Sequence, residues 1–102
     1  MTNSITPEDV RNNEAANRFE VELNGELAQT QYIHRGRKIL FTHTEVPPAF
    51  EGQGVGNALA RAALDYAKRE GLRVVPLCPF IAAFIKRHKE YQSLVEDEAS
   101  TT

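Results

Sequence analysis

A glycine-rich run at residues 50–59 constrains the fold of this chain more than any other feature. The run reads FEGQGVGNAL and places glycines at positions 52, 54 and 56. An apolar stretch typical of a strand precedes it, and an alanine-rich stretch typical of a helix follows. Glycine allows the backbone to approach a bulky anion closely, and the first N–H groups of a helix have no partner within the helix. The run therefore predicts a strand–turn–helix unit that binds a phosphate-bearing ligand.

Three strand-like segments precede this turn. They are expected at residues 19–23, 27–34 and 38–46. Asn24-Gly25 joins the first two and is a strong hairpin signal. Pro47-Pro48 ends the third strand, because proline cannot donate a backbone hydrogen bond. Three strands joined by short turns predict an antiparallel meander.

After the glycine run the apolar spacing becomes that of a helix. One stripe of this helix comprises Val55, Ala58, Leu59, Ala62, Ala63, Tyr66 and Ala67. Gly71 ends the helix, residues 72–78 form a fourth strand, and Pro79 opens a second helix. Residues 91–95 fit either a short helix or a closing strand. The order of elements predicts an α+β fold, a mainly antiparallel sheet with helices packed on it.

The chain has 102 residues and a net charge of -2, which suits one domain with one modest core. Residues 1–17 and 96–102 are polar and acidic, so we expect a flexible N-terminal tail and an acidic C-terminal tail there. The ordered domain is expected over residues 18–95. This middle part is mildly basic, which suits an anionic ligand but is far too weak a signal for nucleic acid.

Several classes of protein are disfavoured. No apolar run approaches the roughly 18 residues of a membrane span, and the first residues lack the pattern of a secretion signal. One cysteine cannot form an internal disulfide, and no Cys/His cluster has the spacing of zinc ligands. The glycines match neither G-x-G-x-x-G nor G-x-x-x-x-G-K-[ST], which argues against a Rossmann site and a P-loop. We expect a soluble cytoplasmic protein without a metal, membrane or nucleic-acid partner.

The glycine run and its surroundings resemble the GNAT superfamily of N-acetyltransferases. In that family a strand, a (Gln/Arg)-x-x-Gly-x-(Gly/Ala) loop and an amphipathic helix form the acyl-CoA pyrophosphate site. Here the loop is residues 51–56, and residues 43–48 and 78–80 carry the rest of the resemblance. The chain looks most like the short single-domain YjdJ-like branch, over roughly residues 18–95. Glu51 replaces the usual Gln or Arg, and an exposed carboxylate there would repel pyrophosphate by up to ~1 kcal/mol.

The resemblance implies a minimal GNAT-like fold with a mixed sheet, and acetyl-CoA as cosubstrate. The amides that would hold the pyrophosphate lie around Gln53, Gly54, Val55, Gly56 and Asn57. The backbone of Glu45 and Val46 would pair with the pantetheine arm, and the fourth strand would splay from the third to admit it. The chain is too short for the helical insert of larger relatives, so the acceptor side would be open.

Acetyl transfer needs a neutral amine, a polarised carbonyl and a proton for the departing thiolate. Strand alternation places His43 and Glu45 on the same face as Ile39 and Phe41. This face would lie beside the thioester, so either residue can serve as a base, directly or through water. Both are equally compatible with an exposed or structural strand position. The Val46 amide is the expected oxyanion donor.

Cys78 is the third catalytic candidate. It is expected at the end of the fourth strand, just before a helix N-terminus, where a thiolate is stabilised. It can accept the acetyl group, protonate the departing thiolate, or line the channel as a small buried hydrophobe. These three roles stay open at this point.

Together these features predict an acetyl-CoA-dependent N-acetyltransferase that acts on a primary amine of a small molecule or a protein. The main alternative is a module that binds acyl-CoA with little or no turnover, because the chain is small and lacks an acceptor lobe. A third interpretation is an interaction protein that keeps only the fold. The acceptor, the preferred acyl chain and the oligomeric state stay open.

Overall fold

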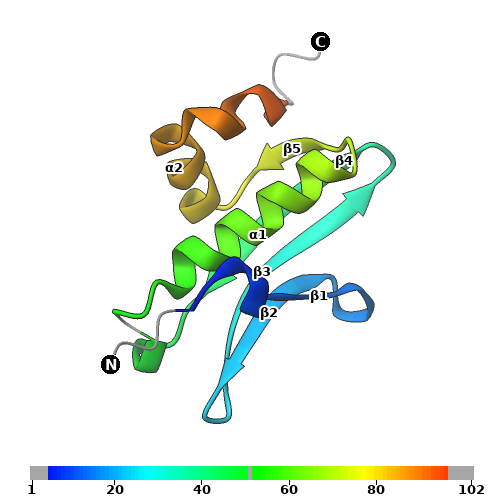
Figure 1. Cartoon of the computed structure of the whole chain (residues 1–102). Coiled ribbons are helices and arrows are strands. Elements are labelled where there is room, and N and C mark those ends of the chain that lie inside the picture. Colours follow the sequence, from blue (N-terminus) through cyan, green and yellow to red (C-terminus); the bar gives the residue numbers. More distant parts are fainter. Residues whose placement is uncertain (1–4, 51, 97–102) are drawn as a thin grey trace.

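The computed structural model describes residues 5–50 and 52–96. Its centre is a five-stranded sheet in the order β1-β2-β3-β4-β5 (Figure 1). The strands are β1 Arg11–Asn13, β2 Arg18–Leu23, β3 Glu26–Arg35, β4 Lys38–Glu45 and β5 Arg73–Pro76. The α-helices are α1 Val55–Arg69 and α2 Pro79–Arg87; the 3-10 helices are η1 Pro7–Asp9, η2 Glu14–Ala16, η3 Pro48–Phe50 and η4 Lys89–Leu94. None of the helices in this described part is long and apolar enough to cross a membrane.

The predicted meander is confirmed. β2, β3 and β4 pair antiparallel in sequence order, and β1 adds antiparallel to β2. At the β2–β3 turn Asn24 has φ 53° and Gly25 has φ 82°, as a tight hairpin with two left-handed residues requires. β5 pairs parallel to β4 after the α1 crossover. The sheet is therefore mixed, and the predicted α+β class is correct.

A β-bulge in β4 overturns part of the predicted alternation. Phe41 pairs with Tyr32 and His43 pairs with Gln31, so Thr42 is an extra residue on β4. Before the bulge Phe41 is fully buried, whereas after it His43 is exposed. The prediction that residues 39, 41, 43 and 45 share one face is wrong beyond Thr42, because the extra residue reverses the phase of the strand.

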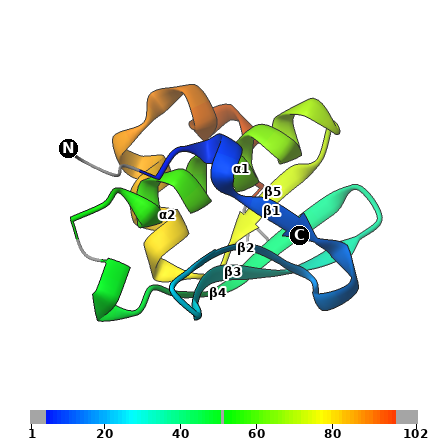
Figure 2. The same ribbon diagram turned by 60° about the horizontal axis from the view of Figure 1, so that its bottom comes forward.

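α1 forms as predicted and packs across one face of the sheet. Figure 2 shows α1 lying over the strands, while no described helix covers the opposite face of β2 and β3. Ala60 and Leu64 lie off the predicted stripe yet are fully buried. α1 contacts α2 as well as the sheet, so its buried face is wider than one stripe. The most deeply buried large side chains include Ile39, Phe41, Phe50, Leu59, Leu64, Ile81 and Phe84.

The C-terminal segment combines both structures that the sequence left open. η4 is a 3-10 helix, and Val95 then forms an isolated parallel bridge with Val74. The hydroxyl of Tyr91 in η4 donates to Asp65 Oδ1 of α1 at 2.7 Å. Burial first, and then this hydrogen bond to the carboxylate, raises the pKa of Tyr91 to about 12. Tyr91 therefore fastens η4 to α1.

Residue 96, the first residue of the predicted acidic tail, is held in the fold. Glu96 donates its N–H to the Val74 carbonyl at 2.8 Å and pairs with Lys38 at 3.0 Å. Its other carboxylate oxygen lies 3.7 Å from Arg73. Glu96 is thus part of the folded domain, and residues 97–102 lie outside the described residues.

Residues 5–17, expected to belong to a flexible tail, are instead folded against the domain. β1 pairs with β2 at the sheet edge, and Arg11 lies 2.6 Å from the buried carboxylate of Glu20. Arg18 reaches the other oxygen of Glu20 at 2.6 Å. Burial opposes the charge, but hydrogen bonds from Arg18 and Arg11 outweigh it and lower the pKa of Glu20. A three-residue polar strand gives no hydrophobic periodicity, which explains the wrong prediction; residues 1–4 lie outside the described residues.

Candidate functional site

The glycine turn has the backbone geometry that its sequence predicts. Gly52 has φ 81° and Gly54 has φ 74°, both in the left-handed region where glycine is favoured. Gly54 is the N-cap of α1, and its carbonyl accepts the N–H of Ala58 at 3.0 Å. The amides of Val55, Gly56 and Asn57 therefore head the helix, where N–H groups lack partners within the helix and the dipole favours an anion.

Gly56 leaves room for a helix contact, whereas the sequence argument for glycine was close approach of the backbone to an anion. A Cβ at this position would lie 2.7 Å from Cζ of Phe80 and 3.3 Å from its Cε1. The first turn of α1 therefore packs directly on the first turn of α2. This contact places the glycine turn beside the point where β5 ends and α2 begins.

β4 and β5 stop pairing part of the way along β4. The parallel ladder runs from Lys38↔Arg73 to Phe41↔Pro76, and the Cys78 N–H then donates to the Phe41 carbonyl at 2.8 Å. β4 continues beyond this point to Glu45, whereas the segment after β5 turns away and enters α2. The predicted splay of the two strands is present in this geometry (Figure 1).

Cys78 lies at the origin of this split. Its residue is only 3 % exposed and occupies the N-cap position of α2, with Pro79 at the first helical position. The thiol donates to Thr44 Oγ1 at 3.2 Å, and Thr44 Oγ1 lies 2.8 Å from Thr30 Oγ1. Thr30 and Thr44 could not be predicted as neighbours of Cys78, because the bulge that turns Thr44 toward Cys78 has no signature in the residue pattern.

His43 and Glu45 lie on the opposite face of β4 from Thr44 and Cys78. Both are exposed, and both pair across the strand with glutamines of β3. Gln29 Nε2 donates to Glu45 Oε1 at 3.4 Å, and Gln31 Nε2 donates to Gln29 Oε1 at 3.2 Å. The structure therefore brings His43 and Glu45 together and separates them from Cys78 by the thickness of the sheet. Val46, the proposed oxyanion donor, is the first residue after β4.

The N-terminal segment also reaches the glycine turn. The Ile5 N–H donates to the Gln53 carbonyl at 2.9 Å, which ties the segment to the loop. A cavity of about 250 Å³ lies between them, lined by Ile5, Thr6, Pro7, Gly54, Asn57, Ala58 and Arg61. Sequence reasoning missed this neighbour of the loop because the segment was expected to be a tail.

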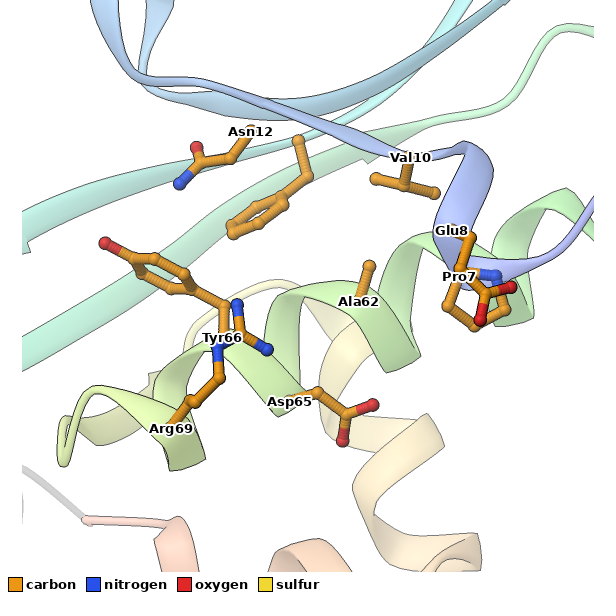
Figure 3. Close-up of a pocket in the computed structure, with 9 residues that line it drawn as sticks. Pro7, Glu8, Val10, Asn12, Ala62, Asp65, Tyr66 and Arg69 are labelled. Atoms are coloured by element: carbon orange, nitrogen blue, oxygen red, sulfur yellow. The ribbon is translucent and has the colours of Figure 1, made fainter.

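A second cavity, of about 420 Å³, lies farther along α1 under the same segment (Figure 3). Its lining residues are Pro7, Glu8, Val10, Asn12, Phe19, Ala62, Asp65, Tyr66 and Arg69. The Arg69 guanidinium lies over the Tyr66 ring, 5.9 Å from its centre. None of the predicted site residues lines this cavity. It is separate from the candidate site at the split.

Comparison with protein families agrees with this geometry. The family model described as GCN5-related N-acetyl-transferase matches residues 18–94. The matched residues include the mixed sheet from β2 to β5, the glycine turn at the head of α1 and the split between the parallel strands β4 and β5. The protein belongs to the GCN5-related N-acetyltransferase family.

Similar curated proteins come from vertebrates and carry the name Protein NATD1. The protein of Bos taurus is 38% identical over 85 residues, which cover 80% of this chain and 75% of the relative. The human protein is 35% identical over the same share of each chain. A GCN5-like protein of Staphylococcus aureus, solved by NMR, aligns with a TM-score of 0.68 and 25% identity, covering 99% of this chain and 96% of that one. The likeness thus extends beyond residues 18–94 to the N-terminal segment.

Proposed function

We propose that this protein is an acetyl-CoA-dependent N-acetyltransferase that transfers the acetyl group to a primary amine. One observation carries the proposal beyond the family assignment. The Gly56–Phe80 contact holds the anion-binding turn beside the split, and Cys78 lies at the origin of that split. The proximity of the glycine turn to the split supports one cosubstrate that has its pyrophosphate at the turn and its thioester at the split, with the pantetheine arm between them.

The backbone supplies the cosubstrate site in this proposal. Amides at Gln53, Gly54, Val55, Gly56 and Asn57 bind the pyrophosphate at the head of α1. The free edge of β4 at Glu45 and Val46 pairs with the pantetheine arm, since β5 no longer occupies that edge. Glu51, the departure from the family loop, lies outside the described residues. Because the contacts are mainly backbone, this replacement leaves binding possible.

The reaction transfers one acetyl group and conserves protons. The amine nitrogen bonds to the carbonyl carbon, the C–S bond breaks, the CoA sulfur gains a proton and the new ammonium loses one. A lysine-like amine has a pKa near 10.4, so deprotonating it at pH 7 costs about 4.6 kcal/mol. Glu45 or His43, both of which lie on the face of the sheet opposite α1, accepts this proton from the amine. The Val46 amide stabilises the oxyanion.

Cys78 acts from the other side of β4. It either accepts the acetyl group from CoA and passes it to the amine, or protonates the departing CoA sulfur. In this arrangement the amine enters from the face of the sheet opposite α1, where Glu45 and His43 are exposed. The thioester lies in the split between the two faces.

Binding is tested by titrating acetyl-CoA into the protein while recording amide NMR shifts. We expect the largest shifts at residues 53–57 and loss of affinity in Gly52→Ala. Gly25→Ala is a matched control, because Gly25 has φ 82° against 81° for Gly52 and neither has an atom within 4 Å of an added Cβ. Equal acetyl-CoA affinity in the two variants would contradict the proposed loop.

Turnover is tested by thiol release from acetyl-CoA in the presence of a panel of primary amines. Release that depends on the amine supports the transferase. Binding without release supports the acyl-CoA-binding module, for which the burial of the Cys78 thiol is the favouring observation. Cys78→Ala at full rate would exclude the covalent route.

A further inference from the structure

Two threonine hydroxyl groups, one fully buried and one half-buried, form a hydrogen-bonded chain with the Cys78 thiol. Thr30 of β3 is fully buried, and its Oγ1 lies 2.8 Å from Thr44 Oγ1. Thr44 is also the acceptor of the Cys78 thiol hydrogen at 3.2 Å. The bulge at Thr42 is what turns Thr44 to this side of the sheet. A strand with regular alternation would place a different residue against the sulfur.

Burial favours one direction for this chain of hydrogen bonds. A buried hydroxyl that donates to nothing carries a penalty, and Thr44 is the side-chain partner of Thr30 in the described structure. Either oxygen can donate in this pair, and the deeper burial of Thr30 favours Thr30 as the donor. A threonine oxygen accepts two hydrogen bonds and donates one, so in this arrangement Thr44 accepts from both Thr30 and Cys78 and its own hydrogen is not used in either bond.

We propose that Thr44 is the positioning residue of Cys78. In the resting protein its oxygen holds the thiol hydrogen, and when the sulfur loses its proton the Thr44 hydroxyl turns to donate to the thiolate. Thr30 keeps the Thr44 oxygen in place in both states. The role in transfer rests on the proposed function, whereas the hydrogen-bond reversal is a property of the protein alone.

Both catalytic roles proposed for Cys78 need this reversal, whereas a cysteine that only lines the channel does not. As acyl acceptor, Cys78 loses its proton, the sulfur bonds to the acetyl carbon, and the CoA sulfur leaves with a proton. As acid, Cys78 gives its proton to the CoA sulfur and regains one from the ammonium formed on the acceptor. Each route passes through a Cys78 thiolate at the position where Thr44 can donate to it.

The test compares Thr44→Val, which keeps the shape and removes the hydroxyl, with Thr44→Ser, which keeps the hydroxyl. Thr42→Val is the matched control, because the Thr42 hydroxyl bonds the Gln31 carbonyl at 3.4 Å instead of the thiol. The chain has one cysteine, so its Raman spectrum contains one S–H stretching band, which Cys78→Ser must remove. Thermal unfolding of each variant confirms that it is folded.

We expect Thr44→Val to move the S–H band to higher wavenumber and to slow iodoacetamide alkylation of Cys78. Acetyl transfer should fall about ten- to hundred-fold, as for loss of a hydrogen bond to a charged group. Thr44→Ser should restore the band and the rate, and Thr42→Val should change neither. An unshifted band and wild-type alkylation in Thr44→Val would overturn the inference. A wild-type protein that releases no thiol with any amine would refute the transferase instead, and the Raman and alkylation results would still decide the role of Thr44.

Discussion

The two halves of β4 differ in strand pairing and in the side chains that they carry. From Lys38 to Phe41 the strand pairs with β3 on one side and β5 on the other, and its side chains alternate regularly. From Thr42 to Glu45 it is bulged, pairs only with β3, and carries polar side chains on both faces. The first half anchors the core, and the second half exposes a free strand edge at the split. One strand thus joins the stable part of the sheet to the candidate site.

The largest effect on stability is expected in the first half of β4. Phe41 is fully buried and its ring meets Tyr32 edge-on, with ring centres 6.4 Å apart. Phe41→Ala should lower the free energy of unfolding by about 3–5 kcal/mol, because it removes buried apolar surface and leaves a cavity. Urea unfolding followed by circular dichroism measures this change. His43→Ala, two residues later, should stay within about 0.5 kcal/mol; similar losses in both variants would remove the distinction between the halves.

The second effect concerns two carboxylates on the open face of the sheet. The pairing register aligns Arg11, Glu20, Gln29 and Glu45 across β1 to β4. Glu20 is buried between two arginines, whereas Glu45 is exposed. Glu20→Gln should therefore cost about 1–3 kcal/mol of unfolding free energy at pH 7, since two arginines lose a charged partner.

This cost depends on pH. The pKa of Glu20 is lowered in the fold from its ordinary value of 4.5, so its contribution is fully present above pH 4.5 and disappears as the pH falls through the folded pKa. The difference between wild type and Glu20→Gln should shrink accordingly in acid. Glu22→Gln, an exposed carboxylate two residues along β2, is the control and should show no such trend. A constant difference from pH 7 to pH 3 would contradict the structural role of Glu20.

The third effect tests the contact that joins the glycine turn to the split. Gly56→Ala forces its Cβ to within 2.7 Å of the Phe80 ring and should cost about 1–2 kcal/mol, because the ring must move. Phe80→Leu should relieve this cost in the double variant. A double-mutant cycle of unfolding free energies measures the coupling. Independent, additive effects would mean that α1 and α2 are not joined at this point.

Sequence reasoning succeeded where local chemistry decides the structure. Asn24-Gly25 predicted the hairpin, the period of the helix predicted α1, and Pro79 predicted the start of α2. It failed where tertiary contacts decide. The bulge at Thr42 shifts the faces of β4 without any unusual residue, so Thr44 was not predicted to meet Cys78.

The N-terminal segment illustrates the same limit. β1 consists of Arg11, Asn12 and Asn13, which show no strand propensity, and its place in the sheet depends on partners distant in the sequence. Asn12 accepts a hydrogen bond from the Tyr32 hydroxyl at 2.7 Å. Such hydrogen bonds between residues distant in the sequence can be predicted only when the positions of the strands are known. The strand–turn–helix backbone at the glycine turn was therefore predicted correctly, whereas the side-chain directions of β4 beyond the bulge were not.

The smallest effect on stability is expected at Glu45, in the second half of β4. Its contact to Gln29 is exposed and measures 3.4 Å, so Glu45→Gln should change the unfolding free energy by less than about 0.5 kcal/mol. If Glu45 is the base of the proposed transfer, the same substitution should lower kcat by about a hundred-fold or more, with the loss greatest at low pH where the amine is most protonated. His43→Gln, measured beside it, assigns the base to whichever variant loses more rate. Wild-type rates in both variants, from a panel of amines, would leave the second half of β4 without a catalytic carboxylate or imidazole and place the proton transfer in solvent.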